Sequence, residues 1–288
     1  MVCIRSRPTH TRDFDAFNAS LTYTIKGTAR VLNEGWFVGL QLIGPIFLLL
    51  TSWTIFNLLG NSALAQFRTQ TGLSAYMPFA IIGFSFEALI MQAAWSGVYS
   101  IRIEAEFGTL EAVFLTPSSK IAWLLGKIAA NLLLALLSTA IVLIVGISAF
   151  SFPLNGTPDI PSAILGVALT LVGMTAFAFA LAGLTFLVKK AEEINQVLWT
   201  SMVFFSGLAF PVEALPNWAR AISEIFPITQ GLEITRGAVL KGTSVFDPTG
   251  VASLEVILIL IAFYLPIGYF SFKRFLKQAK RKGALANY

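Results

Sequence analysis

Residues Arg102–Pro117 read R-I-E-A-E-F-G-T-L-E-A-V-F-L-T-P and form a short polar interruption between two long apolar runs. Four apolar residues in it have the i, i+4, i+7, i+11 spacing of one helix face: Ile103, Phe107, Leu110 and Phe114. Pro117 then ends the helix, and Ser118 or Ser119 can cap the next one. The segment therefore predicts a short amphipathic helix between two membrane spans.

The polar face of this predicted helix is acidic, because three glutamates alternate with its apolar residues: Glu104, Glu106 and Glu111. An acidic helix outside the membrane is suited to bind a partner protein. A solvated connector between spans has the same appearance. The spacing of the residues leaves both interpretations open.

The composition places the chain in the membrane. Of its 288 residues, 56% are hydrophobic and only 12% are charged, whereas about 25% are charged in soluble domains. Several apolar runs reach the ~20 residues that a helix needs to cross a bilayer. We therefore predict an all-α polytopic membrane protein with a single membrane domain at residues 36–272.

Six apolar runs are long enough to be read as spans, at about residues 36–59, 77–101, 121–150, 162–188, 194–210 and 251–272. Ahead of them, a stripe from Phe14 to Leu32 predicts an amphipathic helix at the membrane surface, so residues 1–35 form a cytoplasmic leader with an interfacial helix. Residues 211–250 are too apolar for an ordinary loop. We expect two short, partly immersed (re-entrant) helices there, before the last span.

The positive charges predict the orientation. Sixteen lysines and arginines fall on the side of both termini and four on the other side, so both termini are expected in the cytoplasm of a plasma-membrane protein. The helix at residues 102–117 is then cytoplasmic. The basic tail at residues 273–288 is expected to contact lipid headgroups.

Few residues could perform catalysis. The chain has one cysteine, Cys3, and one histidine, His10, so a disulfide framework, a histidine-based metal site and a serine–histidine hydrolase are not expected. Lys127 follows Gly126, but the next residue is Ile128 and the phosphate-binding loop pattern fails. We therefore predict no catalytic residue, no metal site and no cofactor bound by this chain, which is not expected to be an enzyme.

Four charged residues lie near or within the predicted spans, and each is expected to have a functional or a structural role. Glu87 lies inside the second span, where it either lines a translocation path or is a neutral packing residue bonded to Gln92 or Asn131. Lys127, near the start of the third span, is expected to extend to the surface. Glu233 and Arg236 have the i, i+3 spacing of an ion pair.

Two motifs resemble the permease subunits of type-2 export ABC transporters. The first has the order acid-x-acid-x-Gly-Thr-Leu-Glu-x5-Pro, filled here by Glu104, Glu106, Gly108, Thr109, Leu110, Glu111 and Pro117. The second runs between the fifth and sixth spans and is filled by Pro211, Leu215, Pro216, Trp218, Ile222, Pro227 and Arg236. The six-span plan, the interfacial helix and the short helices before the last span are also similar to that family.

The resemblance implies a half-transporter: two copies would form the pathway, and two ATP-binding cassette subunits, which hold ATP and Mg²⁺, would dock on the helix at residues 102–117. No nucleic-acid partner is implied. Six tryptophans, six tyrosines and 25 phenylalanines favour an apolar or amphipathic, drug-like or lipid-like substrate over a lipid-linked polysaccharide. The alternatives from other classes are a proton-coupled secondary transporter that uses Glu87 and, more distantly, a membrane-embedded enzyme.

Overall fold

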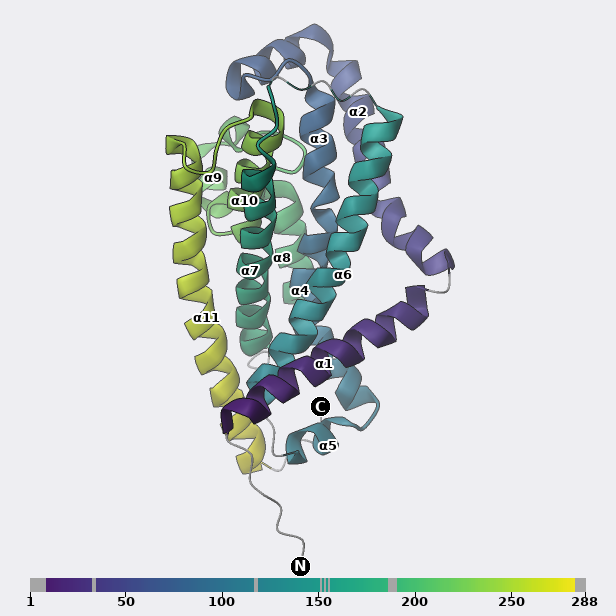
Figure 1. Cartoon of the computed structure of the whole chain (residues 1–288), viewed down its shortest axis with the longest axis vertical. Coiled ribbons are helices and arrows are strands. Elements are labelled where there is room, and N and C mark those ends of the chain that lie inside the picture. Colours follow the sequence, from purple (N-terminus) through teal and green to yellow (C-terminus); the bar gives the residue numbers. More distant parts are fainter. Residues whose placement is uncertain are drawn as a thin grey trace, which may run out of the picture.

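The computed structural model describes residues 9–32, 35–116, 119–150, 152, 154, 156–185 and 191–282. Every regular element within these ranges is helical, which confirms the all-α class (Figure 1). The helices are α1 (Thr9–Leu32), α2 (Gly35–Thr71), α3 (Tyr76–Ser85), α4 (Glu87–Glu106), α5 (Leu110–Leu115), α6 (Lys120–Ala149), α7 (Ile160–Thr185), α8 (Ala191–Phe205), η1 (Val212–Ala214), α9 (Asn217–Ser223), α10 (Pro227–Arg236), η2 (Gly237–Lys241) and α11 (Pro248–Lys282).

The long helices run along one axis and give the molecule two ends (Figure 1). The α5 end carries α5, the oblique helix α1 and the last turns of α11. The α10 end carries η1, α9, α10, η2 and the first turn of α11.

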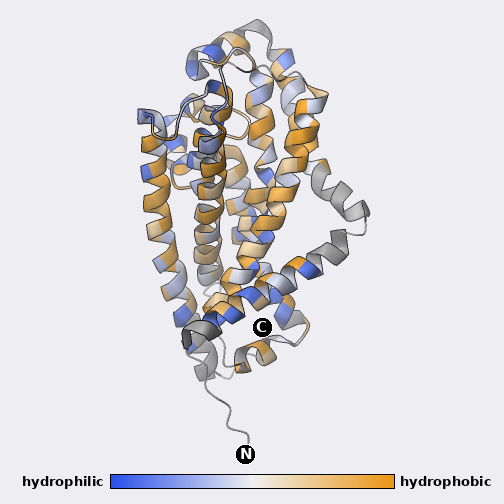
Figure 2. Ribbon diagram, viewed as in Figure 1, coloured by the Kyte–Doolittle hydropathy of each residue, from blue (hydrophilic) through white to orange (hydrophobic). Residues whose placement is uncertain are grey.

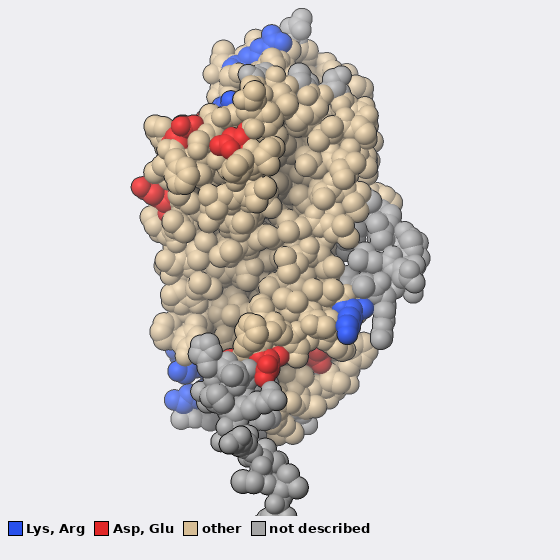
Figure 3. Space-filling view, viewed as in Figure 1, with Lys and Arg blue, Asp and Glu red and all other residues tan. Residues whose placement is uncertain are grey.

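Four helical segments are long and apolar enough to cross a membrane: Tyr76–Glu104 (α3 and α4 together), Lys120–Ala149, Ile160–Gly183 and Pro248–Arg274. A shorter apolar stretch, Ile43–Leu58, lies in α2, and α8 has 15 residues. Apolar residues cover the length of the helices (Figure 2), and on the visible face the charged side chains gather towards the ends (Figure 3). A multi-pass membrane protein is thus supported, while the count of six spans stays a prediction.

The first predicted span is longer than expected. Helical structure in α2 continues to Thr71 across a break at Gly60, whose φ of 70° lies in the left-handed region that glycine tolerates. The stretch between the first two predicted spans is therefore largely helical. Phe67 explains this, because it is 4% exposed and its ring meets those of Tyr76 and Phe79 edge-on. These aromatic contacts order the segment between the two predicted spans.

Small residues let the central helices approach closely. Gly97 on α4 faces α7, where a β-carbon at Gly97 would lie 2.6 Å from the Cβ of Ala182. Gly183 on α7 likewise faces Ser271 of α11, at 2.8 Å. Membrane helices associate through such tight van der Waals contact, since lipid offers no hydrophobic driving force between them. This explains why the small-residue helix α7 lies at the centre of the bundle.

Helix α1 lies across the start of α6 (Figure 1). The hydroxyl of Ser20 donates to the carbonyl of Trp123 at 2.7 Å, and a β-carbon at Gly126 would lie 2.6 Å from the carbonyl oxygen of Phe17. The predicted helix in the leader is therefore confirmed as a helix. Its position at the membrane surface stays a prediction, and residues 1–8 lie outside the described part of the chain.

The segment predicted to contain two short helices before the last span does contain them, as α9 and α10. Helix α10 is buried along almost its whole length and packs against α7 and α11. Close packing with α7 requires Gly231, because a β-carbon there would overlap the hydroxyl of Thr170. The segment is therefore an integral part of the bundle, and its depth in the membrane stays a prediction.

Candidate functional sites at the two ends of the bundle

The predicted acidic helix is interrupted. Helix α4 ends at Glu106, and α5 begins at Leu110. Between them Gly108 has a φ of 66°, and the backbone N–H of Thr109 donates to the carbonyl of Glu104 at 2.9 Å. This is the way in which glycine commonly ends a helix. The prediction of one continuous helix with a single apolar face was wrong, because the left-handed glycine redirects the chain at its centre.

Glu104 does not face solvent as a free carboxylate. It accepts a hydrogen bond from the Thr109 hydroxyl and forms an ion pair with Lys127 on α6, at 2.5 Å. The two charged side chains are only 13% and 9% exposed. Lys127 therefore points inward and does not extend to the surface as predicted; its Nζ also lies 4.8 Å from the centre of the Trp123 ring. This ion pair ties α4 to α6.

A second lysine holds α5 itself. The Nζ of Lys120, at the start of α6, donates to the carbonyls of Val113 and Thr116 at 2.8 and 2.6 Å. These carbonyls belong to the last turn of α5 and the residue after it, where a cation is favourable. Ser119 caps α6 by accepting a hydrogen bond from the N–H of Ala122, as predicted. In the sequence, Lys120 contributes only to the positive charge that predicts the orientation.

The α5 end presents apolar side chains to its surroundings. Phe107 is 78% and Leu115 is 85% exposed, and Ile103 is also exposed. In a membrane protein, exposed apolar side chains contact either lipid or a partner chain, and Phe107 and Leu115 lie beyond the end of the candidate span at Glu104. Four further residues of the predicted coupling site cannot be placed: the side chains of Glu106, Leu110 and Glu111, and the whole of Pro117, lie outside what the structure describes. Their contact with a partner stays a prediction.

At the opposite end, Arg236 is buried and joins three segments. Its guanidinium donates to the carbonyls of Phe79 on α3 and of Gly207 and Leu208 after α8, at 2.6–3.2 Å. Its Cζ also lies 3.5 Å from the centre of the Phe79 ring. Burial lowers the pKa of Arg236 to about 9. The carbonyl dipoles supply the stabilisation that water would otherwise give to the charge.

The predicted ion pair between Glu233 and Arg236 is not formed. Arg236 turns to the three carbonyls, whereas Glu233 turns the other way and accepts a hydrogen bond from Ser253 of α11 at 3.1 Å. A helix spacing of i, i+3 permits contact but does not require it. Gly83 makes room for the observed arrangement, since a β-carbon there would lie 2.2 Å from an Arg236 nitrogen.

Glu87 lies at the first turn of α4, where Phe86 interrupts the second predicted span, and it is 6% exposed. Neither Gln92 nor Asn131 bonds to it. No hydrogen bond or ion pair joins its carboxyl group to another residue in the part of the chain that the structure describes. The expected packing partners are therefore wrong, and a path-lining role stays a prediction.

Comparison with known proteins extends the resemblance. The model of the ABC-2 type transporter family matches residues 21–240, a range that holds both motifs. Nodulation protein J of Sinorhizobium fredii is 29% identical over 240 residues, which cover 74% of this chain and 85% of that protein. The probable doxorubicin resistance ABC transporter permease protein DrrC of Mycobacterium tuberculosis is 24% identical over 253 residues, covering 85% of this chain and 87% of DrrC.

A third relative matches over a shorter region. The probable multidrug ABC transporter permease YbhR of Escherichia coli is 28% identical over 152 residues, which cover 50% of this chain and 39% of YbhR. The family match spans well over half of the chain, and the helical bundle described above agrees with a membrane-embedded permease. This chain therefore belongs to the ABC-2 type transporter family, as a permease.

Proposed function

We propose that this chain is the membrane subunit of an ATP-driven exporter, in which two copies form the pathway and separate ATPase subunits bind the α5 end. The proposal rests on the contacts that attach α5 and the preceding helix α4 to α6. Lys120 holds its last turn to α6, and the Glu104–Lys127 ion pair holds the preceding helix α4 to the same helix. A push on α5 would therefore move α4 and α6 together.

The proposed mechanism is alternating access by shifts of packed helices. ATP and Mg²⁺ would be held by the partner subunits, and their closure would displace the short helix α5. Because α4 also packs against α7 and α8, the displacement would reach the centre of the bundle. Packed helices move between discrete arrangements more readily than they deform. This chain would supply the pathway and no chemistry.

The proposed orientation follows from the charges. The α5 end would face the cytoplasm of the plasma membrane, together with both termini, and the basic residues of the last turns of α11 would contact lipid headgroups. Lys189, Lys190 and residues 283–288 lie outside the described part of the chain. No nucleic-acid partner is proposed.

The proposed substrate is an apolar or amphipathic, drug-like or lipid-like molecule. Two relatives are named as a probable multidrug transporter permease and a probable doxorubicin resistance permease, which supports this class for the present chain. The many phenylalanines agree with an apolar path. Stimulation of ATP hydrolysis in the reconstituted complex by a panel of amphipathic drugs and lipids would identify the substrate.

Co-purification tests the docking surface. Phe107→Asp should abolish recovery of the ATPase subunit, because a carboxylate would replace an exposed apolar contact at the α5 end. Phe246→Asp is the matched control, since Phe246 is 75% exposed but lies just before α11, in the α10-end linker. Equal recovery of the ATPase with both variants would contradict the proposal.

A proton-coupled carrier is the second candidate, favoured by the buried Glu87 carboxyl, which lacks a described partner. It predicts transport in the absence of any ATPase that fails in Glu87→Gln. ATP-dependent transport that persists in Glu87→Gln would exclude it.

A further inference from the structure

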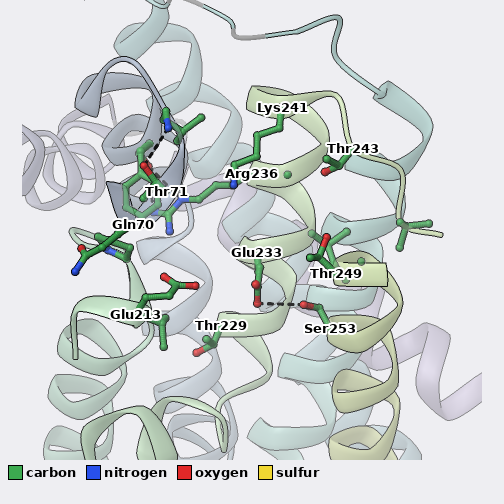
Figure 4. Close-up of a pocket in the computed structure, with 18 of the residues that line it drawn as sticks. Gln70, Thr71, Glu213, Thr229, Glu233, Arg236, Lys241, Thr243, Thr249 and Ser253 are labelled. Carbon is green, nitrogen blue, oxygen red and sulfur yellow. Dashed lines mark hydrogen bonds between the residues drawn. The ribbon is translucent and has the colours of Figure 1, made fainter. Parts of the chain in front are cut away.

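Helix α8 is held by several contacts where it reaches the α10 end. The chain turns directly after the helix at Gly207, whose φ is 81°. Arg236 donates to the Gly207 carbonyl at 2.6 Å, and Figure 4, a view into the cavity at this end, shows its side chain extended from α10 towards Thr71. Phe205, the last residue of α8, meets the ring of Trp218 on α9 edge-on. Moving this end of α8 would therefore break contacts to both α9 and α10.

The other half of α8 contains buried polar groups without a partner. In the part of the chain that the structure describes, four buried polar side-chain atoms lack a hydrogen-bond partner, and three of them belong to Asn195 and Trp199. The two residues have the i, i+4 spacing of one helix face, and Asn195 is 0% exposed. The fourth atom is the hydroxyl oxygen of Ser96 on α4. Burial of an amide or an indole N–H without a partner is unfavourable, so the observed packing of α8 is destabilised at these two residues.

Polar side chains on the other long helices do find partners. Thr139 on α6 and Thr170 on α7 each donate to the carbonyl four residues earlier, at 3.0 and 2.7 Å. Asn57 on α2 does the same, at 2.8 Å from the carbonyl oxygen of Trp53. An asparagine in a helix can therefore be satisfied by its own backbone. Asn195 is exceptional, because it is fully buried and both polar atoms of its amide are unpaired.

The surroundings of α8 leave it room to move. Apart from α9 at its last turns, the helix packs chiefly against α4. Its opposite face is open, since Val197 is 65% and Phe204 is 60% exposed. Asn195 lies in the second turn of α8, counted from the α5 end. Separation of this half of α8 from α4 would therefore admit water to the unpaired groups, while the contacts at Gly207 stay in place.

We propose that α8 is a hinged gate, which pivots at Gly207 and separates from α4 at the α5 end, so that Asn195 and Trp199 become hydrated. Because the unpaired groups destabilise the closed packing, the open arrangement is populated without any ligand. An apolar residue at position 195 would keep the gate closed. The movement is a property of this chain alone, whereas its use as the opening of an export pathway rests on the proposed function.

Distances between spin labels test the pivot without any ATPase. Pairs of labels are attached to exposed residues of α4 and α8 in a Cys3→Ser background: Ile103→Cys with Gln196→Cys near the α5 end, and Met91→Cys with Phe204→Cys nearer the pivot. The labelled chain is diluted with unlabelled chain in lipid nanodiscs, so that only distances within one copy are measured. The pair near the α5 end should show two distances, and the pair nearer the pivot should show one.

Two variants of similar shape should shift the gate in opposite directions. Asn195→Leu removes the unpaired amide, so the share of the longer distance should fall at least about fivefold, as expected for one unsatisfied buried group. Asn195→Asp introduces a carboxyl group that favours water more strongly, so this share should rise. Thr139→Val is the control, because it removes a buried hydroxyl that is paired within α6, and it should leave the two distances unchanged.

A single distance for the pair near the α5 end, both in the parent chain and in Asn195→Asp, would overturn the proposal. An equal spread of distances at the two label pairs would do so too, as would a shift in the same direction with leucine and with aspartate. Thermal unfolding gives an independent measurement. Asn195→Leu should unfold at a higher temperature than the parent chain, whereas a lower temperature would show that the buried amide is favourable, contrary to the proposal.

Discussion

The two ends of the bundle stabilise a buried cation in different ways. At the α5 end, Lys127 on α6 forms an ion pair with the carboxylate of Glu104, which lies on the neighbouring helix α4. At the α10 end, Arg236 is held by backbone carbonyls of two segments and by the face of Phe79. A carboxylate can be removed or protonated, whereas a carbonyl cannot. The cation at the α5 end therefore depends on one ionisable partner, whereas the cation at the α10 end depends on backbone groups that do not titrate.

This difference agrees with the role proposed for the α5 end. An end that receives a displacement benefits from contacts that can rearrange, and the left-handed Gly108 lies beside the Glu104–Lys127 pair. In the proposed mechanism, the α10 end would hold α10 against α3 and α7 while the other end moves.

Arg236→Met should have the largest effect. It leaves the three carbonyls at Phe79, Gly207 and Leu208 without their donor, at about 1–3 kcal/mol for each buried unsatisfied group. We expect a loss of about 3–6 kcal/mol in the free energy of unfolding, measured by denaturant titration in detergent. Arg220→Met, in an exposed i,i+4 pair, should change it by less than about 1 kcal/mol. Similar losses for the two variants would show that the carbonyl contacts contribute little.

Breaking the α5-end pair should cost less in stability. Lys127→Met leaves Glu104 buried without its partner, which costs about 3 kcal/mol in comparable pairs. The double variant Lys127→Met/Glu104→Leu should recover most of that loss, because both charges are then gone. The same unfolding titration, applied as a double-mutant cycle, measures the coupling. Additive losses would mean that the two side chains do not interact.

Gly108→Ala should have a small effect on stability and a larger one on coupling. A β-carbon there meets no atom within 4 Å, so the change costs only the strain of a φ of 66°, about 1–2 kcal/mol. Because α5 would be redirected, substrate-stimulated ATP hydrolysis in the reconstituted complex should fall more than stability does. Gly27→Ala, also in open space but on the helix α1, is the control. Equal ATP hydrolysis by the two variants would mean that Gly108 has no role in the coupling to the ATPase.

The smallest expected effect is a pH dependence at the α10 end. Burial raises the pKa of Glu233, so the folded chain binds a proton there more tightly than the unfolded chain does. The ionised carboxylate therefore lowers stability above its folded-state pKa, and this loss disappears as the pH falls towards 4.5, the ordinary value. The groups that act on it are Glu213, Lys241 and Arg220.

Glu233→Gln carries no such charge, so it should be more stable than the parent chain near pH 8 and equally stable near pH 4. Thermal unfolding of both proteins across this range measures the difference. A difference that does not change with pH would assign the effect to the Ser253 hydrogen bond and not to the charge of the carboxylate.

Much of the bundle could be predicted from the sequence, and the errors have physical causes. The apolar runs identified most of the long helices, and α9 and α10 were found between Pro211 and Gly250. The prediction of a continuous acidic helix was wrong, because the helical spacing of the apolar residues continues across Gly108, which breaks the helix. The predicted Glu233–Arg236 pair failed because the carbonyls that bind Arg236 come from residues more than 25 and more than 150 positions away.

The membrane environment, the helical class and the places of the two motifs follow from the sequence alone, because hydropathy and residue spacing are local properties. Which charges are buried, and what they contact, depends on the tertiary fold. Lys127 and Lys120 are both lysines near the start of one helix, yet one is paired inside the bundle and the other caps a neighbouring helix. A charge takes the partner that the fold brings within reach, and that distance is not a property of the local sequence.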